Sequence, residues 1–368
     1  MKNKTKSVFY PNESHQTTSI HIANKLQSGV RHKTNSIANH PSHQLFKSEN
    51  KLPMLCNDYE QLSQIGSGSF GYVYKCRHVP TGRFVAVKVF KVKYASKAKA
   101  YENKEVKILR KFQSAEEKKK GSHSPYVMKA IDIIYENGKL HIVFELMELN
   151  LTQFIRKRKS ESLKRFDEGL EIKVISKQLL MGMQYLNEEL GIMHRDIKPD
   201  NIMVNSNPLS IKIIDFGTSK DCLTNKGPHT SYVSTRWYRA PECILRSHNY
   251  TMNSDIFAVG CVIAELYLMH PLFPGVSELD QLEKVFKVLG TPKKDQWREG
   301  YKLAEKHEIT FTEYPKKNLM SIMPYMTEDA HEAMKMMLKI SSQKRGSASQ
   351  VLLMQFFKQD ITPLTQVT

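Results

Sequence analysis

The sequence predicts an α+β protein made of two lobes, and two observations support that prediction. Short alternating apolar runs fill residues 59–145, and turn-forming residues separate them. One separator is Asn137-Gly138, a strong signal for a two-residue hairpin. After Leu149 the apolar residues instead recur at every third or fourth position, as they do between Ile172 and Leu186. A small β-rich half followed by a larger helical half is typical of an α+β design.

The smaller half is expected to form a five-stranded antiparallel sheet with one helix. The predicted strands are Tyr59–Ile65, Gly71–Arg77, Phe84–Phe90, Met128–Tyr135 and Leu140–Glu145. The helix is predicted over Lys97–Phe112, and the stretch Phe112–Pro125 is expected to be a solvated loop, with an extension of the helix as the alternative. Further helices are predicted around Ser254–Leu268, Glu278–Leu289, Glu328–Leu338 and Ser347–Met354.

The positive charge is spread over the whole chain of 368 residues. The net charge is +18, of which residues 1–52 contribute +6. Residues 1–58 are polar and basic without a helical or strand period, so we expect a disordered tail. The folded unit is then residues 59–357, followed by a short tail over 358–368. No nucleic-acid reader motif accompanies the charge, so no specific nucleic-acid partner is expected.

Membrane and secretory classes do not fit the composition. The longest nearly apolar run, Phe257–Leu268, is too short for a membrane span and contains Glu265. The five cysteines are odd in number and show no C-x-x-C pair, which disfavours a disulfide framework and a zinc site. A soluble protein of a reducing compartment is expected, with the cytoplasm as its location.

A glycine-rich motif, Gly66-Ser-Gly-Ser-Phe-Gly-Tyr-Val73, lies between the first two predicted strands. The same glycine spacing occurs in dinucleotide-binding folds, but there it joins a strand to a helix. Between two strands it is typical of a hairpin that covers nucleotide phosphates. Glycine allows the backbone to approach the phosphates because it has no Cβ.

A lysine on the third predicted strand completes this half of the site. Lys88, in Val85-Ala-Val-Lys88, can reach the phosphates if a carboxylate holds it in place. Glu105 in the predicted helix is the preferred partner, and Glu102, one turn earlier, is the alternative.

The remaining catalytic groups are predicted in two short motifs, His194-Arg-Asp-Ile-Lys-Pro-Asp-Asn201 and Asp215-Phe-Gly217. Phosphoryl transfer to a hydroxyl needs metal ligands, a proton acceptor and cations for the transferred charge. Asn201 and Asp215 are predicted to hold Mg²⁺, because amide and carboxylate oxygens suit that ion. Asp196 is predicted to accept the proton, and Lys198 with Lys88 to supply the positive charge.

In these motifs the chain resembles the eukaryotic protein kinases. Ala240-Pro-Glu242 is a further landmark of that family, Asp255 matches the aspartate of its central helix, and Arg345 matches the arginine that pairs with Glu242. The resemblance implies a bilobal kinase fold, with an N-lobe over 59–147, a C-lobe over 148–357 and ATP in the cleft. It also implies nucleotide contacts from Ile65, Gly66, Ser67, Gly68, Ser69, Phe70, Gly71, Tyr72, Val73, Ala86, Lys88, Phe144, Glu145 and Met147.

A finer resemblance involves the segment before Glu242. Ser234-Thr-Arg-Trp-Tyr-Arg-Ala-Pro-Glu242 is similar to the signature of the CMGC group, and Thr230-Ser-Tyr232 matches its T-x-Y phosphorylation switch. Leu289–Trp297 is most similar to the RCK subfamily, which contains the male-germ-cell-associated kinase. Members of that subfamily are associated with cilia and flagella, so the cilium or flagellum and the nucleus are alternative locations.

The group resemblance also implies how the enzyme is regulated and what it selects. Thr230 and Tyr232 are the expected phosphosites, and the residues expected to hold the phosphates are Arg195, Lys220, Lys104, Arg236 and Arg239. Lys220 and Lys104 depart from the arginines usual in the family, and lysine offers a point charge rather than a bidentate fork. The resemblance also implies that Arg239 holds the carbonyl of Ser234, so that this carbonyl is not offered to the substrate. Substrates with proline after the serine or threonine are then expected, because proline has no N–H.

Three alternatives to an RCK-type kinase remain at this stage. A cyclin-dependent kinase would carry a partner-binding helix of the P-S-T-A-I-R-E kind, and Tyr101-Glu-Asn-Lys-Glu-Val has no such signature. A mitogen-activated kinase is the second alternative, and a catalytically inactive scaffold is the third. The scaffold is disfavoured because Lys88, Asp196, Asn201 and Asp215 are all present. The expected partners are protein substrates with Ser/Thr-Pro sites and an upstream kinase, for a monomeric enzyme.

Overall fold

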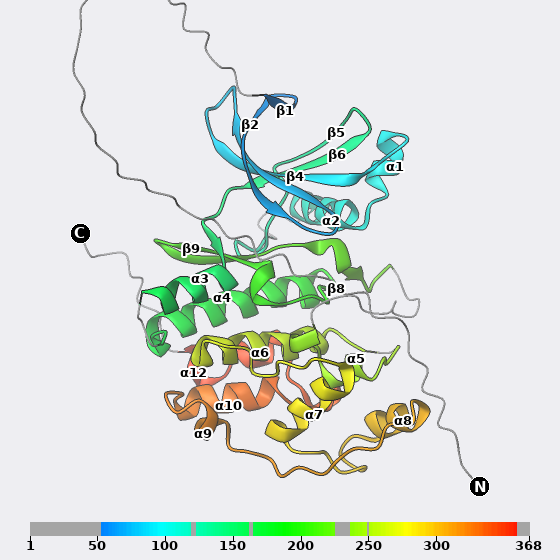
Figure 1. The fold of residues 1–368 in the computed structure, drawn as a ribbon, viewed down its shortest axis with the longest axis vertical. Helices are drawn as coiled ribbons and strands as arrows, with labels where there is room; N and C mark the ends of the chain where they lie inside the picture. The colour runs from blue at the N-terminus through cyan, green and yellow to red at the C-terminus, as the bar shows by residue number, and fades with distance from the viewer. Residues whose placement is uncertain (1–52, 119–122, 162–164, 225–235, 249, 359–368) are drawn as a thin grey trace, which may run out of the picture. The chain divides into compact units, whose positions relative to one another are not determined.

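The computed structural model describes residues 53–118, 123–161, 165–224, 236–248 and 250–358. Figure 1 shows the strands β1 to β6 gathered with α1 and α2, and the helices from α3 onward in the rest of the described chain. The predicted α+β class with a sheet-rich N-lobe and a helical C-lobe is confirmed. Across the described ranges, no helix combines the length and apolar composition that a membrane crossing requires.

The N-lobe sheet is antiparallel and has six strands in the described residues, one more than predicted. Their order is β1-β2-β3-β4-β6-β5. The strands are β1 (Met54–Cys56), β2 (Tyr59–Ser67), β3 (Gly71–His78), β4 (Phe84–Lys93), β5 (Asp132–Glu136) and β6 (Lys139–Glu145). The added strand β1 lies inside the segment predicted to be tail up to residue 58. It pairs with β2 and buries Cys56, so regular structure begins before the predicted boundary.

The predicted N-lobe helix is two helices, α1 (Lys97–Tyr101) and α2 (Lys104–Lys118). The Asn103 side chain accepts hydrogen bonds from the backbone N–H groups of Glu105 at 2.9 Å and Val106 at 3.4 Å. These are helix-capping contacts, so Asn103 starts a new helix where the prediction continued the old one. The prediction of a loop after Phe112 is also wrong for residues 112–118, because α2 continues through this charged stretch to Lys118.

The C-lobe contains most of the helices. Its α-helices are α3 (Leu151–Ser160), α4 (Lys173–Gln184), α5 (Pro241–Ile244), α6 (Asn253–Leu268), α7 (Glu278–Leu289), α8 (Arg298–Lys306), α9 (Leu319–Ile322), α10 (Glu328–Met337), α11 (Ala348–Leu352) and α12 (Gln355–Lys358). Two short π-helical turns, η1 (Glu168–Ile172) and η2 (Tyr185–Glu189), extend α4 at its two ends. The 3₁₀ turns are η3 (Pro199–Asn201), η4 (Phe216–Thr218), η5 (Arg236–Tyr238) and η6 (Ser342–Lys344). The four later helices predicted from the sequence are thus present, with small differences at their ends.

Two small sheets place the catalytic motifs next to the C-lobe helices. One joins β7 (Leu149–Asn150), β9 (Ile202–Ser206) and β10 (Leu209–Ile213), and the other joins β8 (Ile192–Met193) and β11 (Lys220–Asp221). The two short motifs therefore follow or precede paired strands, which fixes their backbones.

The main hydrophobic core extends from the N-lobe into the C-lobe. Phe112 of α2 packs edge-on against Phe216, with ring centroids 5.0 Å apart. A second cluster lies on the other face of the sheet and includes Cys56, Val87 and Val143. The predicted pair of Glu242 and Arg345 is present and fully buried, at 2.8 Å.

Candidate active site

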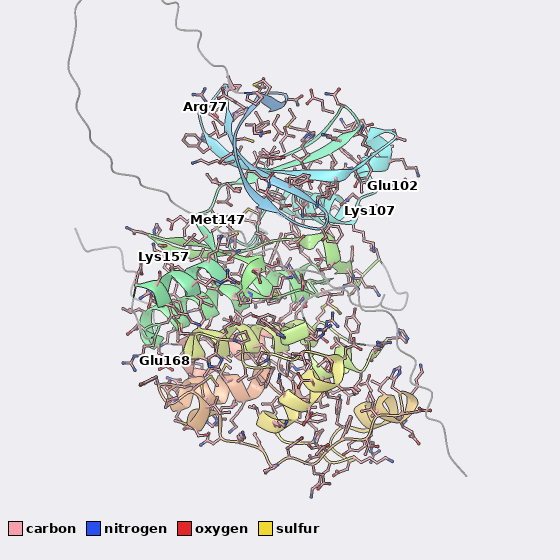
Figure 2. All side chains as sticks on the ribbon, in the orientation of Figure 1. Arg77, Glu102, Lys107, Met147, Lys157 and Glu168 are labelled. Carbon is pink, nitrogen blue, oxygen red and sulfur yellow. The ribbon has the colours of Figure 1, made fainter. Side chains whose placement is uncertain are left out.

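A cavity of about 570 Å³ lies between the glycine-rich hairpin and the catalytic motifs. It is lined by nearly all of the predicted nucleotide-contacting residues, namely Ile65, Gly66, Ser67, Gly68, Ser69, Phe70, Gly71, Val73, Ala86, Lys88, Phe144, Glu145 and Met147. Figure 2 labels Met147, which lies in the connection between β6 and β7. The volume is within the usual range for small-molecule sites.

Tyr72 is the exception among those residues, because it does not line this cavity. Successive residues of a strand point to opposite faces of the sheet. Gly71 and Val73 of β3 face the cavity, so Tyr72 lies on the opposite face, where the ammonium group of Lys91 sits 4.8 Å from its ring centroid. The predicted nucleotide contact of Tyr72 therefore has no support from the lining of this cavity.

The glycine-rich hairpin is closed by backbone contacts that tolerate only glycine at position 71. A Cβ added to Gly71 would lie 2.3 Å from the carbonyl oxygen of Val89, which is closer than real Cβ atoms approach. The N–H of Gly68 donates to the carbonyl of Gly71 at 2.9 Å, and Lys91 Nζ donates to the carbonyl of Gly68 at 2.7 Å.

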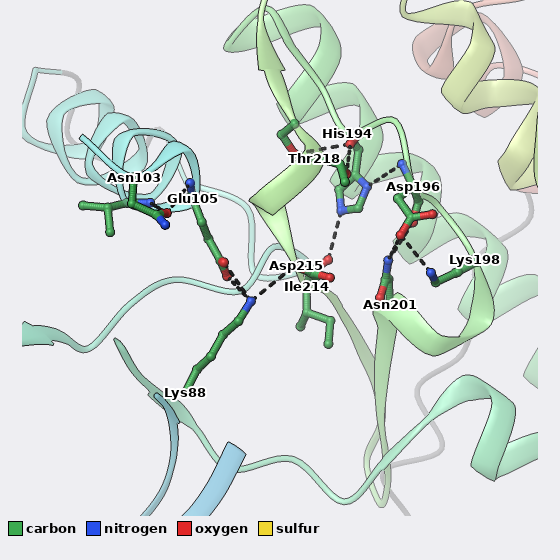
Figure 3. A network of polar contacts seen from close by, with 12 residues as sticks. Lys88, Asn103, Glu105, His194, Asp196, Lys198, Asn201, Ile214, Asp215 and Thr218 are labelled. Carbon is green, nitrogen blue, oxygen red and sulfur yellow. Dashed lines mark hydrogen bonds and ion pairs between the residues drawn. The ribbon is translucent and has the colours of Figure 1, made fainter. Parts of the chain in front are cut away.

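Lys88 is held by two carboxylates, as Figure 3 shows. Its Nζ lies 2.9 and 2.7 Å from the two oxygens of Glu105 and 3.2 Å from Asp215 Oδ1. Glu102, labelled in Figure 2, instead contacts Lys99 at the end of α1. The structure thus selects Glu105, the preferred of the two predicted partners.

The charges of this group are tuned by burial and by one another. Burial alone would lower the pKa of Lys88, but Glu105 and Asp215 raise it above the usual value. Burial raises the pKa of Glu105 above its usual value, although the positive charge of Lys88 acts to lower it. Asp215 is more exposed, so Lys88 outweighs burial and holds the pKa of that carboxyl below its usual value. The lysine therefore stays protonated beside an ionised Asp215.

Asp196 is the centre of a second polar cluster (Figure 3). Its Oδ2 accepts hydrogen bonds from Lys198 Nζ at 2.8 Å and Asn201 Nδ2 at 2.9 Å. Asn201 Nδ2 also donates to the backbone carbonyl of Asp196 at 2.8 Å. These contacts fix the orientation of the carboxylate, which is almost fully buried.

Asp255 holds the backbone at the start of the His194–Asn201 motif. This buried carboxylate accepts hydrogen bonds from the N–H groups of His194 and Arg195, both at 2.8 Å. The His194 ring lies 2.9 Å from the Ile214 carbonyl, next to Asp215. Arg195 and Asp215 both have left-handed backbones, with φ of 70° and 65°. Such conformations are strained for non-glycine residues, and the surrounding contacts hold them in place.

The predicted metal ligands suit Mg²⁺ by their chemistry. Asn201 donates two hydrogen bonds through Nδ2, which leaves its amide oxygen as a ligand atom. Asp215 supplies an ionised carboxylate that lines the same cavity. Hard oxygen donors of this kind are the ligands that Mg²⁺ prefers.

Nine further residues line the cavity without having been predicted. They are Met128, Leu146, Asn150, Gln153, Asp200, Met203, Ile214, Phe216 and Thr218. Five of them, Met128, Leu146, Met203, Ile214 and Phe216, are apolar and look like ordinary core residues in the sequence. Asn150 and Gln153 form a capping box at the start of α3, a signal that indicates a helix start and not a cleft.

The five residues predicted to hold the phosphates of the activation segment lie on separate elements and have different contacts. Arg195 donates from Nε to the Thr218 carbonyl at 2.5 Å and from NH1 to Tyr250 Oη at 3.2 Å. Lys104 is exposed at the start of α2, and Lys220 lies in β11. Arg236 donates to the Val276 carbonyl at 3.2 Å, and buried Arg239 lies 3.6 Å from Glu278. Thr230, Tyr232 and Ser234 lie outside the described residues.

The protein kinase domain family matches residues 59–357. The chain belongs to that family, and the predicted recognition is thereby confirmed. Mouse serine/threonine-protein kinase ICK is 38% identical over 302 residues, which is 82% of this chain and 45% of that protein. Human serine/threonine-protein kinase MAK is 39% identical over 302 residues, covering 82% and 46%. Cyclin-dependent kinase F-3 of rice, Oryza sativa subsp. japonica, is 37% identical over 299 residues, covering 81% and 65%.

These relatives support the finer resemblance as well. The ICK and MAK kinases represent the RCK subfamily of the CMGC group, so the similarity to that subfamily is confirmed. The chain spans a little under half the length of these two relatives.

Proposed function

We propose that this chain is an ATP-dependent serine/threonine protein kinase that phosphorylates serine or threonine followed by proline. The observation that carries the proposal is the joining of Lys88, Glu105 and Asp215 in one network beside the oriented carboxylate of Asp196. An inactive scaffold would have no need for this complete set. Family membership and the names of the relatives support the same activity.

Each group then has a definite task in phosphoryl transfer. Lys88, fixed by Glu105, binds the α- and β-phosphates of ATP. Asn201 and Asp215 would hold Mg²⁺, which would supply positive charge next to the phosphates. Asp196 orients the substrate hydroxyl and accepts its proton, while Lys198 stabilises the negative charge near the transferred group.

The cavity supplies the remaining binding energy for the nucleotide. The glycine-rich hairpin covers the phosphates, and the backbone groups of Glu145 and Met147 bind the adenine edge. Ala86 and Met203 offer apolar surface to the base from two different lobes. Phe144 borders the back of this pocket.

Regulation and specificity form the finer part of the proposal. Phosphorylation of Thr230 and Tyr232 by an upstream kinase or by the enzyme itself would order the segment around them, through Arg195, Lys104, Lys220, Arg236 and Arg239. Arg239 would hold the Ser234 carbonyl, so that the substrate residue after the phosphorylation site meets no acceptor for an N–H. Proline has no N–H and is therefore preferred. A role in cilia or flagella, or elsewhere in the cytoplasm or nucleus, is proposed from the RCK resemblance.

The activity is tested with the substitution Asp196→Asn. Loss of the proton acceptor should lower turnover by roughly 10²- to 10⁴-fold while ATP still binds, because the proposed nucleotide and metal ligands remain. Turnover is measured with radiolabelled ATP and affinity by calorimetry. A parallel loss of nucleotide affinity would contradict the assigned role of Asp196.

Specificity and regulation are tested on a peptide array with phosphorylated and phosphatase-treated enzyme. Ser-Pro peptides should react faster than Ser-Ala peptides, and Tyr232→Phe should reduce both the rate and the preference. Equal rates for the two peptide classes with phosphorylated enzyme would refute the proline-directed part while leaving the kinase activity intact.

A further inference from the structure

A second cavity, of about 600 Å³, lies on the face of the N-lobe sheet opposite the nucleotide cavity. The alternation of side chains along β3 shows this, because Gly71 and Val73 line the nucleotide cavity whereas Tyr72 and Tyr74 line the second one. Three consecutive residues of β4, Val89, Phe90 and Lys91, also line the second cavity. We call this second cavity the outer basin. Its volume is close to that of the nucleotide cavity.

The outer basin has an apolar and aromatic interior. Val89 is buried in its floor, and the rings of Tyr72 and Tyr74 line it with centroids 6.4 Å apart. One wall comes from β1 and the other from the β5–β6 hairpin, and the two are tied by the Asn57 N–H, which donates to Glu136 at 3.2 Å. This contact also engages the basin's one lining carboxylate among the described residues.

A buried histidine provides a polar group inside this apolar surface. His141 lines the basin, is only 3% exposed, and its Nδ1 has no hydrogen-bond partner among the described residues. Burial lowers the pKa of His141, so its ring adds no positive charge to the interior of the basin. Because the Nδ1 atom is covered, a ligand in the basin would meet the edge of a neutral ring there.

Two lysines give the rim of the basin a positive charge. Lys139 and Lys91 both line it and are exposed. Lys91 also donates to the Gly68 carbonyl at 2.7 Å and sits over the Tyr72 ring at 4.8 Å. A group bound in the basin would therefore touch the lysine that holds the glycine-rich hairpin.

We propose that the outer basin is a second ligand site for a small aromatic carboxylate, and that its occupancy changes nucleotide binding through Lys91. The aromatic ring would stack on Tyr72 and Tyr74 above Val89, and the carboxylate would pair with Lys139 and Lys91. By drawing Lys91 away from the Gly68 carbonyl, the ligand would loosen the hairpin that covers the phosphates. Lys91 is then a positioning residue for the hairpin. The binding half of this proposal is independent of catalysis.

The test uses calorimetry on the full chain, with 2-naphthoate as the probe and neutral 2-naphthamide as its matched control. A saturating non-hydrolysable ATP analogue with Mg²⁺ occupies the nucleotide cavity, so that only a separate site can respond. Naphthoate should bind about ten-fold more tightly than the amide, and Lys139→Glu should remove that difference. Lys107→Glu, the same charge change at an exposed position of α2, should leave it intact (Figure 2).

The coupling is measured in a second titration. Saturating naphthoate should weaken the binding of the ATP analogue by about 5-fold, and Lys91→Met should abolish this effect. Reciprocal coupling means that the ATP analogue should also weaken naphthoate binding by about 5-fold and no further. Absence of naphthoate binding up to about 1 mM, complete displacement of naphthoate by rising concentrations of the analogue, or an unchanged affinity in Lys139→Glu would overturn the binding site. An effect on the analogue that persists in Lys91→Met would overturn the coupling.

Discussion

At the scale of single residues, the site depends on a few polar side chains whose neighbours fix their charge. Lys88 is the clearest case, because it is nearly buried and still protonated between two carboxylates. A buried charge is stable only while its partner is present, since removal of one partner leaves the other uncompensated. The ion pair should therefore behave as a unit.

This expectation is tested with a double-mutant cycle. Lys88→Met and Glu105→Gln should each lower turnover, and the double variant should be no worse than Lys88→Met alone, with a coupling of about 0.5–3 kcal/mol. Initial rates at saturating ATP and peptide measure all four proteins. Strictly additive losses would show that the two side chains act independently.

The polar catalytic residues predicted from the sequence lie around one cavity, and they could be singled out because most of them belong to short contiguous motifs. The sequence did not separate Tyr72 from the residues that line the cavity, because a motif gives the order of residues but not the face of the strand on which each one lies. It also missed Met203 and Ile214, whose apolar side chains look like ordinary strand core until the fold places them in a cavity.

At the scale of elements, the position of α2 matters most, because this helix carries Glu105. Periodicity predicted one long helix, since it detects apolar spacing and not the competition between helix continuation and a side-chain cap. Asn103 decides that competition, and it also donates to Tyr94 Oη at 2.9 Å. The strand β1 was missed for a related reason, because three residues are too few to show an alternating pattern.

The cap makes a prediction about stability. Asn103→Ala should reduce the free energy of unfolding by about 1 kcal/mol, because the first N–H groups of α2 lose their acceptor. Asn103→Asp keeps an acceptor at the same place and should stay close to the parent protein. Urea unfolding followed by circular dichroism measures both, and equal losses in the two variants would argue against capping as the cause.

At the scale of the whole molecule, buried ion pairs join segments that are distant in the chain. Arg345 reaches Glu242 across 103 residues, and Ser254 Oγ also donates to that glutamate at 2.8 Å. The sequence predicted this pair from resemblance alone, because no local pattern connects residues so far apart.

Loss of this pair should destabilise the C-lobe strongly. Arg345→Ala should cost about 3–5 kcal/mol in the free energy of unfolding, because it leaves the Glu242 carboxylate buried without its cation. Arg246→Ala is the matched control, since its side chain is 65% exposed beside Glu278 and should cost about 1 kcal/mol or less. Equal losses in the two variants, measured by chemical denaturation, would contradict the importance of burial.

A second long-range pair, between Lys111 and Asp221, joins α2 to β11 and should make stability depend on pH. Their charged atoms lie 2.8 Å apart, and Asp221 also accepts a hydrogen bond from the Leu223 N–H at 3.0 Å. Burial alone would raise the pKa of Asp221, but Lys111 and the Leu223 N–H hold that pKa below its usual value of 3.8. A carboxyl whose pKa is lower in the folded than in the unfolded state stabilises the fold at pH values above the unfolded pKa, and that contribution is lost as the pH falls through the folded pKa.

Asp221→Asn should therefore be less stable than the parent protein at neutral pH. The gap between their free energies of unfolding should narrow as the solution is acidified below the unfolded pKa. Urea unfolding at a series of pH values measures the gap, and Asp295→Asn, a change at an exposed aspartate, controls for the lost charge. A gap between parent and Asp221→Asn that stays constant across the acid range would show that the carboxylate does not gain its stabilising effect from ionisation.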